Sequence, residues 1–286
     1  MSENKKYKFL LLNAFSLPAD SPYAHRSMEG PKESRLMNYK DIKHLLNDVD
    51  WDLHNGAIAS YGDWPVETRE EFAYASAARL PIVKEACESG KYNAIVLLGG
   101  GEPGFKESRE IAKKYNIPVT SCAHSQFHFA TLLGNKFSVI DISDLHNMYY
   151  YDLVISHRMT DRCASIRNLN FPLPRPGVTV NEPIHEEKKR ALSGQRSNML
   201  DTAIEESIAA IEEDGAEVIT LGCSAAFWLK PFLERGLSEL GWDIPVLEGY
   251  SCAIELAKSY VNLQLDVSGL MVPNDHPINY RRKKLF

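Results

Sequence analysis

The sequence lacks the features that would place it in a membrane or on a nucleic acid. None of its apolar runs approaches the roughly 20 residues that a membrane-spanning helix needs. Positive charge is not in excess, because the formal net charge is −6, whereas nucleic acids and anionic membranes favour basic surfaces. The apolar stretch near the N-terminus is too short for a signal peptide and is interpreted as a first strand. We therefore expect a cytoplasmic protein that binds a small-molecule substrate, with no nucleic-acid partner and no membrane partner.

The sequence also lacks the spacing of a metal site, a disulfide framework or a phosphate-binding loop. Neither a CxxC nor a CxxH pattern occurs among the cysteines, which are Cys87, Cys122, Cys163, Cys223 and Cys252. An odd number of cysteines in a reducing compartment indicates free thiols. The glycine run at 99–101 is not followed by the Gly-Lys-Ser/Thr ending of a phosphate-binding loop. We therefore expect a cofactor-independent protein with no metal, flavin or nucleotide.

What the sequence does have is a regular alternation of strand and helix patterns, which is typical of parallel sheets. A chain of 286 residues is long enough for one large domain or two modest lobes. Strands are expected at 7–13, 93–98, 117–121, 137–142, 217–221 and 244–247. Helices are expected at 70–89, 106–115, 198–214, 228–240 and 251–263. The proline-rich region 167–194 is expected to be an irregular loop.

The two halves of the chain share one order of elements: strand, glycine-containing turn, helix, and an Ile-Pro-Val strand. The phrases are NAIVLLGGGEPGF…NIPVT and AEVITLGCSAAFW…DIPVL, and their similar spacing favours an ancient duplication over chance. We expect an α/β fold with two pseudo-symmetric lobes, each a parallel sheet flanked by helices. The first lobe would span 1–133 and the second 134–250, with a C-terminal helix and tail at 251–286 packing back on the first lobe. Ligands bind beyond the carboxyl ends of parallel strands, so Gly99 and Cys223 would face each other across a cleft.

Cys223 is the candidate catalytic residue, because it follows a strand and a glycine and precedes a helix. Amides at a helix start favour an anion, which makes a thiolate accessible near neutral pH. Such a thiol can take a carbon-bound proton and return it, and the amides of Ser224 and Ala225 would bind an oxyanion. The alternative is a buried cysteine that merely tolerates a tight turn, and the residues alone leave both interpretations open.

Four segments, in order, resemble the hydantoin racemase branch of the aspartate/glutamate racemase superfamily over nearly the whole chain. Residues 62–68 (GDWPVET) are similar to the family's Gly-Pro-x-Ser-Ile-Glu-Ser, and residues 101–104 (GEPG) to its Gly-Asp-Pro-Gly. Residues 162–167 (RCASIR) are similar to its Arg-Cys-Ala-Ser-Val-Arg, and EDGAEVI at 213–219 leads into Cys223 as in the family. Their order and spacing together carry the resemblance.

The resemblance implies two opposed cysteines that work on the two faces of an α-carbon. Cys223 matches the second cysteine, but Gly99 stands where the first would be. Arylmalonate decarboxylases, which resemble racemases, also have glycine at the first position, followed by hydroxyl residues that this chain lacks. Three functions therefore stay open: a racemase or isomerase acting on a hydantoin-like or amino-acid-derived substrate, a single-cysteine decarboxylase, and a non-catalytic ligand-binding relative.

Other candidate residues follow the expected strands of the first lobe. Glu102, Cys122 and His124 are the candidates to replace the missing base. The alternative for Glu102 is a carboxylate at the start of a helix, and the alternative for Cys122 and His124 is a structural role. The candidate substrate-binding residues are Asn13, Ser16, Gly99, Gly100, Gly101, Thr120, Ser224 and Ala225. Asn13 matches the first Asn of the family's Asn-Pro-Asn-Thr segment. Residues 148–151 are a further candidate for the cleft mouth, and the resemblance implies a homo-oligomer.

Overall fold

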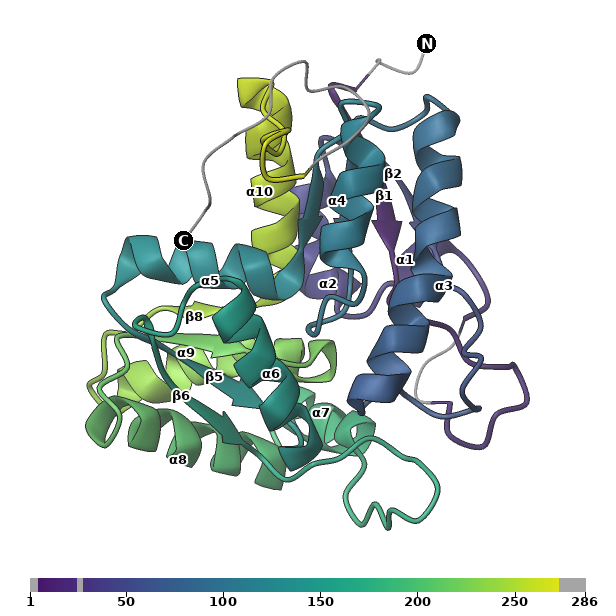
Figure 1. The fold of residues 1–286 in the computed structure, drawn as a ribbon. Helices are drawn as coiled ribbons and strands as arrows, with labels where there is room; N and C mark the ends of the chain where they lie inside the picture. Colours follow the sequence, from purple (N-terminus) through teal and green to yellow (C-terminus); the bar gives the residue numbers. More distant parts are fainter. Residues whose placement is uncertain (1–4, 25–27, 273–286) are drawn as a thin grey trace.

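The computed structural model describes residues 5–24 and 28–272, so the far end of the expected C-terminal tail lies outside the described residues. Two four-stranded parallel sheets form the framework (Figure 1). The first sheet, ordered β2-β1-β3-β4, consists of β1 (Tyr7–Leu12), β2 (Val49–His54), β3 (Ala94–Leu97) and β4 (Val119–Ser121). The second, ordered β6-β5-β7-β8, consists of β5 (Phe137–Asp141), β6 (Cys163–Asn168), β7 (Val218–Leu221) and β8 (Val246–Leu247). Both sheets follow the same order, which confirms the predicted two-lobe α/β fold.

Helices cover both faces of each sheet. In the first half they are α1 (Lys32–Arg35), α2 (Tyr39–Ile42), the 3-10 helix η1 (Lys43–Leu46), α3 (Arg69–Glu88), α4 (Phe105–Lys113) and α5 (Cys122–Leu133). In the second they are α6 (Asp144–Ser156), α7 (Ile184–Leu192), α8 (Asn198–Glu212), the 3-10 helix η2 (Ser224–Leu229), α9 (Lys230–Glu239) and α10 (Gly249–Leu263). Within the described ranges, none of these helices is long and apolar enough to cross a membrane.

The strands are apolar on both sides because both sheet faces are covered. In β1, Leu10 and Leu12 pack with α3 and α4, whereas Phe9 and Leu11 face the core that includes α10. The central strands β3 and β7 are buried throughout. Helix α10 returns to the first sheet, where the Thr120 hydroxyl donates a hydrogen bond of 2.8 Å to the Ala253 carbonyl. Residues that follow the carboxyl ends of β1 and β3 in the first sheet and of β7 in the second sheet lie around one cavity.

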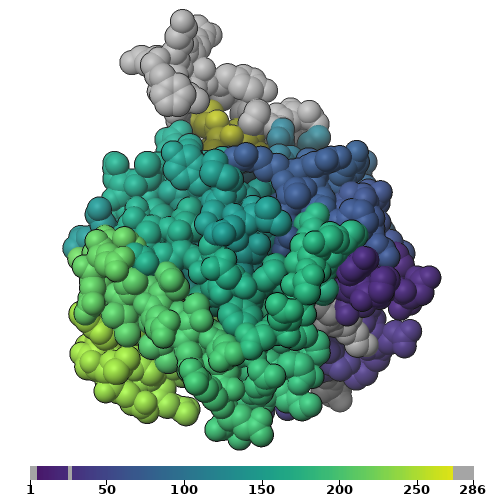
Figure 2. Space-filling model, turned by 90° about the horizontal axis from the view of Figure 1, so that it is seen from below, coloured from purple at the N-terminus to yellow at the C-terminus, as the bar shows by residue number. Residues whose placement is uncertain are grey.

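The prediction that 167–194 is an irregular loop throughout is wrong. Its first two residues end β6, and Ile184–Leu192 forms α7. Pro183 precedes this helix, acidic residues lie in its first turn and basic residues in its last, which is the charge order that a helix dipole favours. The remaining segment, 169–183, crosses to the first lobe, and seen from below it lies beside the blue and purple segments of that lobe (Figure 2).

Candidate functional site

A small cavity lies at the carboxyl ends of β1, β3 and β7, where the two lobes meet. Its volume is about 50 Å³, which is room for roughly four waters if each needs about 10–15 Å³. Seven of the predicted site residues line it: Asn13, Gly99, Gly100, Gly101, Cys223, Ser224 and Ala225. The two strand-end turns that the sequence places on opposite walls therefore do share one cavity.

The glycine turn after β3 is shaped by two local constraints. Gly99 has φ +103°, a conformation that L side chains rarely adopt, and a Cβ built there would lie 2.9 Å from the Ala14 Cβ. A Cβ on Gly100 would overlap the carbonyl oxygen of Gly222, so the turns of the two lobes touch. Residues 99–104 match the G-x-G-x-x-G spacing, and the middle of this turn packs against the Gly222 carbonyl.

Cys223 follows β7 and Gly222, and it is the residue that precedes η2. Its side chain is half-buried and faces the cavity. The backbone N–H of Cys223 donates a hydrogen bond of 2.6 Å to Oδ1 of Asp141, the last residue of β5. The helix that the sequence predicts at 228 begins earlier, as a short 3-10 turn that continues into α9. Its first-turn amides, at Ser224 and Ala225, have no acceptor one turn earlier in the helix and lie at the cavity wall.

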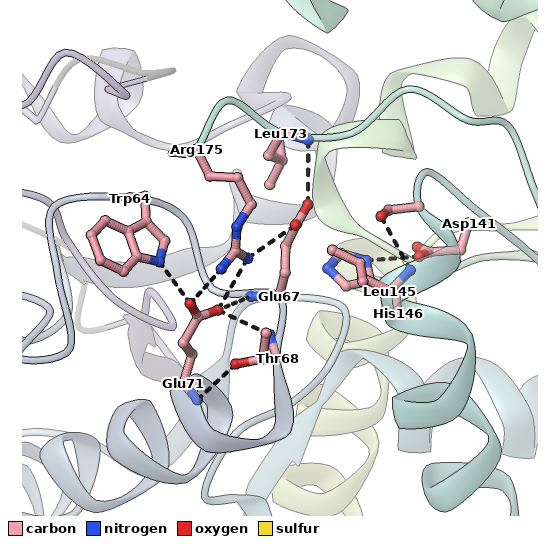
Figure 3. A network of polar contacts seen from close by, with 10 residues as sticks. Trp64, Glu67, Thr68, Glu71, Asp141, Leu145, His146, Leu173 and Arg175 are labelled. Carbon is pink, nitrogen blue, oxygen red and sulfur yellow. Dashed lines mark hydrogen bonds and ion pairs between the residues drawn. The ribbon is translucent and has the colours of Figure 1, made fainter. Parts of the chain in front are cut away.

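The other oxygen of Asp141 holds a histidine that sequence analysis missed. Asp141 Oδ2 lies 2.7 Å from Nδ1 of His146, in the first turn of α6 (Figure 3). Both residues are buried, and His146 lines the cavity. Burial alone would lower the pKa of His146, but the charge and hydrogen bond of Asp141, the charge of Glu67 and the Val66 carbonyl together raise this pKa above its usual value. Nε2 of His146 makes no hydrogen bond of ordinary geometry within the described residues.

Tyr150, one turn further along α6, completes this wall of the cavity. A Cβ on Gly100 would also meet the Tyr150 hydroxyl, which places the phenol at the contact between the two glycine turns. Burial raises the pKa of Tyr150 well above its usual value, and the negative charges of Asp141 and Cys223 act in the same direction. The phenol therefore stays protonated and can donate a hydrogen bond beside Cys223.

An ion-pair cluster holds the segment 169–183, which follows β6, against the first lobe. Arg175 contacts Glu67 at 3.0 Å and Glu71 at 2.7 Å, and the fully buried Glu67 also accepts from the Leu173 N–H at 3.4 Å (Figure 3). Leu173 and Val66 line the cavity on either side of this cluster. Leu173 and Arg175, which follow the second-lobe strand β6, are thus held on the first lobe beside the cavity.

Glu102, a predicted base, lies beside the cavity-lining Gly101 but points elsewhere. Its carboxylate accepts hydrogen bonds from the Ser121 hydroxyl at 2.6 Å and the His124 N–H at 2.8 Å, and it contacts Nε2 of His157. These contacts cap the start of α5. This structural role accounts for the burial of the Glu102 carboxylate, and no catalytic role is needed to explain it. Glu102 is not among the residues that line the cavity.

The four remaining predicted residues are also absent from the cavity wall. Cys122 contacts the Leu97 carbonyl, and burial raises its pKa well above the usual value. The His124 ring packs 4.9 Å from the Phe105 ring, and burial lowers its pKa. The hydroxyls of Ser16 and Thr120 donate to backbone carbonyls, at 3.2 Å and 2.8 Å. Parallel strands bring residues to one edge of a sheet, but the start of α5 turns the side chains of Cys122 and His124 into the core.

A larger apolar groove adjoins the cavity. Its volume is about 370 Å³, and it shares Met37, Leu173 and Ala225 with the cavity wall. The rest of its wall is largely proline and other apolar residues, including Trp228 and Ile184. Within the described ranges, no group of three or more His, Cys, Asp or Glu side chains is placed to hold a metal ion. The site therefore combines a small cavity, whose wall includes the titratable residues Cys223, His146 and Tyr150, with an apolar groove beside it.

Comparison with known proteins gives the family and the fold of the chain. Residues 62–257, well over half of the chain, match the Asp/Glu/Hydantoin racemase family. The chain belongs to this family. It is 30% identical over 194 residues to a hydantoin racemase from Pseudomonas sp. (strain NS671), which covers 66% of each protein, just under two thirds. It is 28% identical to a hydantoin racemase from Paenarthrobacter aurescens, over 73% of this chain and 78% of that protein.

A solved structure shares the fold at lower sequence identity. The allantoin racemase from Klebsiella pneumoniae superposes with a TM-score of 0.66 at 19% identity, covering 96% of this chain and 97% of that chain. The family match includes β3, β5 and β7 with Cys223, and β1 lies before it. The cavity wall that carries the titratable groups thus lies inside the matched region.

Proposed function

We propose that the protein is a cofactor-independent racemase or isomerase that moves a proton at the carbon α to a carbonyl, with Cys223 as an acid/base residue. Its membership of a racemase family supports the reaction class. One observation supports the residue: Cys223 is a half-buried thiol on the wall of a cavity where two symmetric turns meet. A thiol in that place can reach a bound α-carbon while most water is excluded.

The surroundings of Cys223 suit the charge that this reaction develops. When the α-proton leaves, negative charge moves to the adjacent carbonyl oxygen, and oriented hydrogen-bond donors stabilise it. The amides at the start of η2 and the protonated Tyr150 phenol are donors in the same cavity. Asp141 holds the backbone N–H of Cys223 and so fixes the turn that carries the sulfur.

The shape of the site supports a small ring bearing an apolar substituent. The small cavity that carries Cys223 adjoins an apolar groove of about 370 Å³. A 5-substituted hydantoin has these two parts, with an acidic hydrogen on the carbon that joins them. We propose this substrate class, which is also named in the relatives at 28% and 30% identity.

Proton NMR in D₂O tests the proposal. Single enantiomers of 5-substituted hydantoins are incubated with the wild type and with Cys223→Ala, and optical rotation is followed in parallel. We expect the wild type to exchange the α-proton and lose rotation, and Cys223→Ala to lose racemisation by about 10²- to 10⁴-fold, the usual range for acid/base groups. Cys163→Ala, which removes a half-buried thiol that the cavity does not include, is the matched control.

Two results would replace the proposal. Release of carbon dioxide from α-substituted malonates, with one product enantiomer and no racemisation of hydantoins, would show a single-cysteine decarboxylase. Binding of hydantoins without exchange or racemisation would show a non-catalytic relative.

A further inference from the structure

Racemisation requires a second group that the predicted residues do not supply. Inversion at carbon needs acid/base groups on both faces, because one side chain does not readily reach both. Cys223 provides one, and Gly99 provides none. The carboxylate of Glu102 and the thiol of Cys122 are used inside the first lobe. His124, the third candidate, packs among aromatic rings away from the cavity wall.

A different titratable residue does line the cavity with Cys223. His146, in the first turn of α6, lines the cavity, and Figure 3 shows its contact with Asp141. Asp141 joins the two residues, since its Oδ1 accepts from the Cys223 backbone N–H at 2.6 Å and its Oδ2 lies 2.7 Å from His146 Nδ1. One buried carboxylate therefore fixes both the turn that carries the sulfur and the orientation of the imidazole. This is the arrangement of an acid/base histidine held by an orienting carboxylate.

We propose that His146 is the second acid/base group of the reaction and that Asp141 is its positioning residue. The inference rests on the proposed function, because it concerns the other half of the same proton transfer. Nδ1 is held by Asp141, which leaves Nε2 as the atom that exchanges a proton with the substrate.

The groups around His146 favour this role. Asp141 faces the imidazole from β5, and Glu67 acts on it from the segment before α3. The Val66 carbonyl also acts on the imidazole, and the rings of Phe72 and Tyr150 lie at 6.3 Å and 6.4 Å from its centroid. Both carboxylates favour the imidazolium, so the pKa of His146 is raised in spite of burial. An imidazolium in this place can donate a proton to the substrate.

The proton transfers balance in both directions. From one enantiomer, the Cys223 thiolate takes the α-proton as the Cα–H bond breaks, and the His146 imidazolium gives its Nε2 proton to the opposite face. The enzyme then carries a thiol and a neutral imidazole. From the other enantiomer, neutral His146 takes the proton and the Cys223 thiol returns one. No oxidation occurs and no co-reactant is needed.

His146→Asn is the main test, because the asparagine amide can still donate to Asp141 in place of Nδ1. Each enantiomer of the substrate is incubated separately in D₂O with the wild type, His146→Asn and Cys223→Ala. The α-proton signal reports exchange, and chiral chromatography reports configuration. His128→Asn, which changes a histidine exposed on α5, is the matched control and should racemise like the wild type.

The expected result is a complementary pattern of exchange. His146→Asn should lose racemisation by about 10²- to 10⁴-fold but still exchange the α-proton of one enantiomer with retention, through Cys223. Cys223→Ala should exchange only the opposite enantiomer. If His146→Asn racemises within a few-fold of a racemising wild type, or loses exchange of both enantiomers equally, the assignment of His146 is overturned while the proposed function stands. A wild type that racemises nothing overturns the proposed function instead.

Asp141→Asn tests the positioning role through the pKa of His146, which the loss of a purely structural contact would not change. Removing the carboxylate should lower the pKa of His146, so the fall in rate on the alkaline side should begin at lower pH than in the wild type. The imidazole C2-proton resonance of His146, followed through a pH titration by NMR, should show the same shift without any substrate. An unchanged titration in folded Asp141→Asn would contradict the positioning role.

Discussion

Gly100 and Gly222 hold the two halves of the site together by touching across the cleft. A Cβ on Gly100 would overlap the Gly222 carbonyl oxygen. Each glycine belongs to the turn after the third strand of its lobe, so the contact brings equivalent points of the two lobes together. This close contact is possible because Gly100 has no side chain.

Gly100→Ala should therefore damage both stability and activity. The added methyl group meets backbone rather than a flexible side chain, so the lobes must move apart. We expect a loss of about 1–3 kcal/mol in the free energy of unfolding, the usual cost of overpacking, and a larger loss of racemisation because the walls of the cavity separate. Thermal unfolding and polarimetry measure the two effects.

Gly269→Ala is the control for that substitution, since a Cβ at Gly269 meets nothing within 4 Å and its φ lies outside the left-handed region. The control should unfold and turn over like the wild type. If Gly100→Ala also kept the stability and the activity of the wild type, the contact between the two turns would not be tight enough to shape the site.

Gly99→Cys should not create an ordinary two-cysteine site. The resemblance implies a cysteine at this position, but φ is +103° and the new Cβ would lie 2.9 Å from the Ala14 Cβ. Residues forced into such backbone conformations cost about 1–3 kcal/mol each. We expect Gly99→Cys and Gly99→Ala to lose similar stability in chemical denaturation, with no gain in racemisation from the thiol. A faster Gly99→Cys enzyme would show that the backbone relaxes and that the lost cysteine alone limits the reaction.

The sequence predicted the framework of the site because strand patterns and glycine turns are local signals. The duplicated phrases placed Gly99 and Cys223 at the ends of equivalent strands, and both do line one cavity. The sequence could not show which way side chains point at the start of α5. Glu102 and His124 therefore stayed candidates until the structure showed them inside the first lobe.

The sequence contains only weak indications of Asp141, His146 and Tyr150, which the sequence analysis did not place in the site. Asp141 stands near the end of the expected strand 137–142, at the edge where ligands bind. Ser143 then caps a helix that brings His146 and Tyr150 to one face, four residues apart. Sequence analysis identified no helix in this segment, so it could not bring the two residues together. The Arg175 cluster was also missed, because it joins residues about 100 positions apart.

Arg175→Met should destabilise the protein in a pH-dependent way. Burial alone would raise the pKa of Glu71, but hydrogen bonds from Trp64, the Thr68 and Glu67 amides and Arg175 hold this pKa below its usual value. A lowered pKa means that the ionised Glu71 stabilises the fold above about pH 4.5, and that this contribution disappears as the pH falls through the folded pKa. We expect a loss of about 3–5 kcal/mol near pH 7, typical of a broken buried pair.

Melting temperatures between pH 3 and pH 8 measure that effect. The difference between the wild type and Arg175→Met should be largest near neutral pH and should shrink below pH 4.5 as Glu71 is protonated. Arg196→Met, which removes an exposed partner of Asp201, should show no such dependence. A difference that stays constant with pH would mean that Arg175 acts by packing rather than by charge.

Ala225→Leu should change substrate selectivity, because Ala225 lies where the cavity opens into the apolar groove. A longer side chain there narrows the passage through which a substituent would extend, while the ring still fits beside Cys223. For a hydantoin with a benzyl or isobutyl group we expect kcat/KM to fall by about 10- to 200-fold, the range for a misfit of one or more methylene groups in an apolar pocket. The methyl-substituted hydantoin serves as the internal control and should lose much less. An equal loss for both substrates would place the substituent outside the groove and leave Ala225 as part of the wall around the reacting carbon.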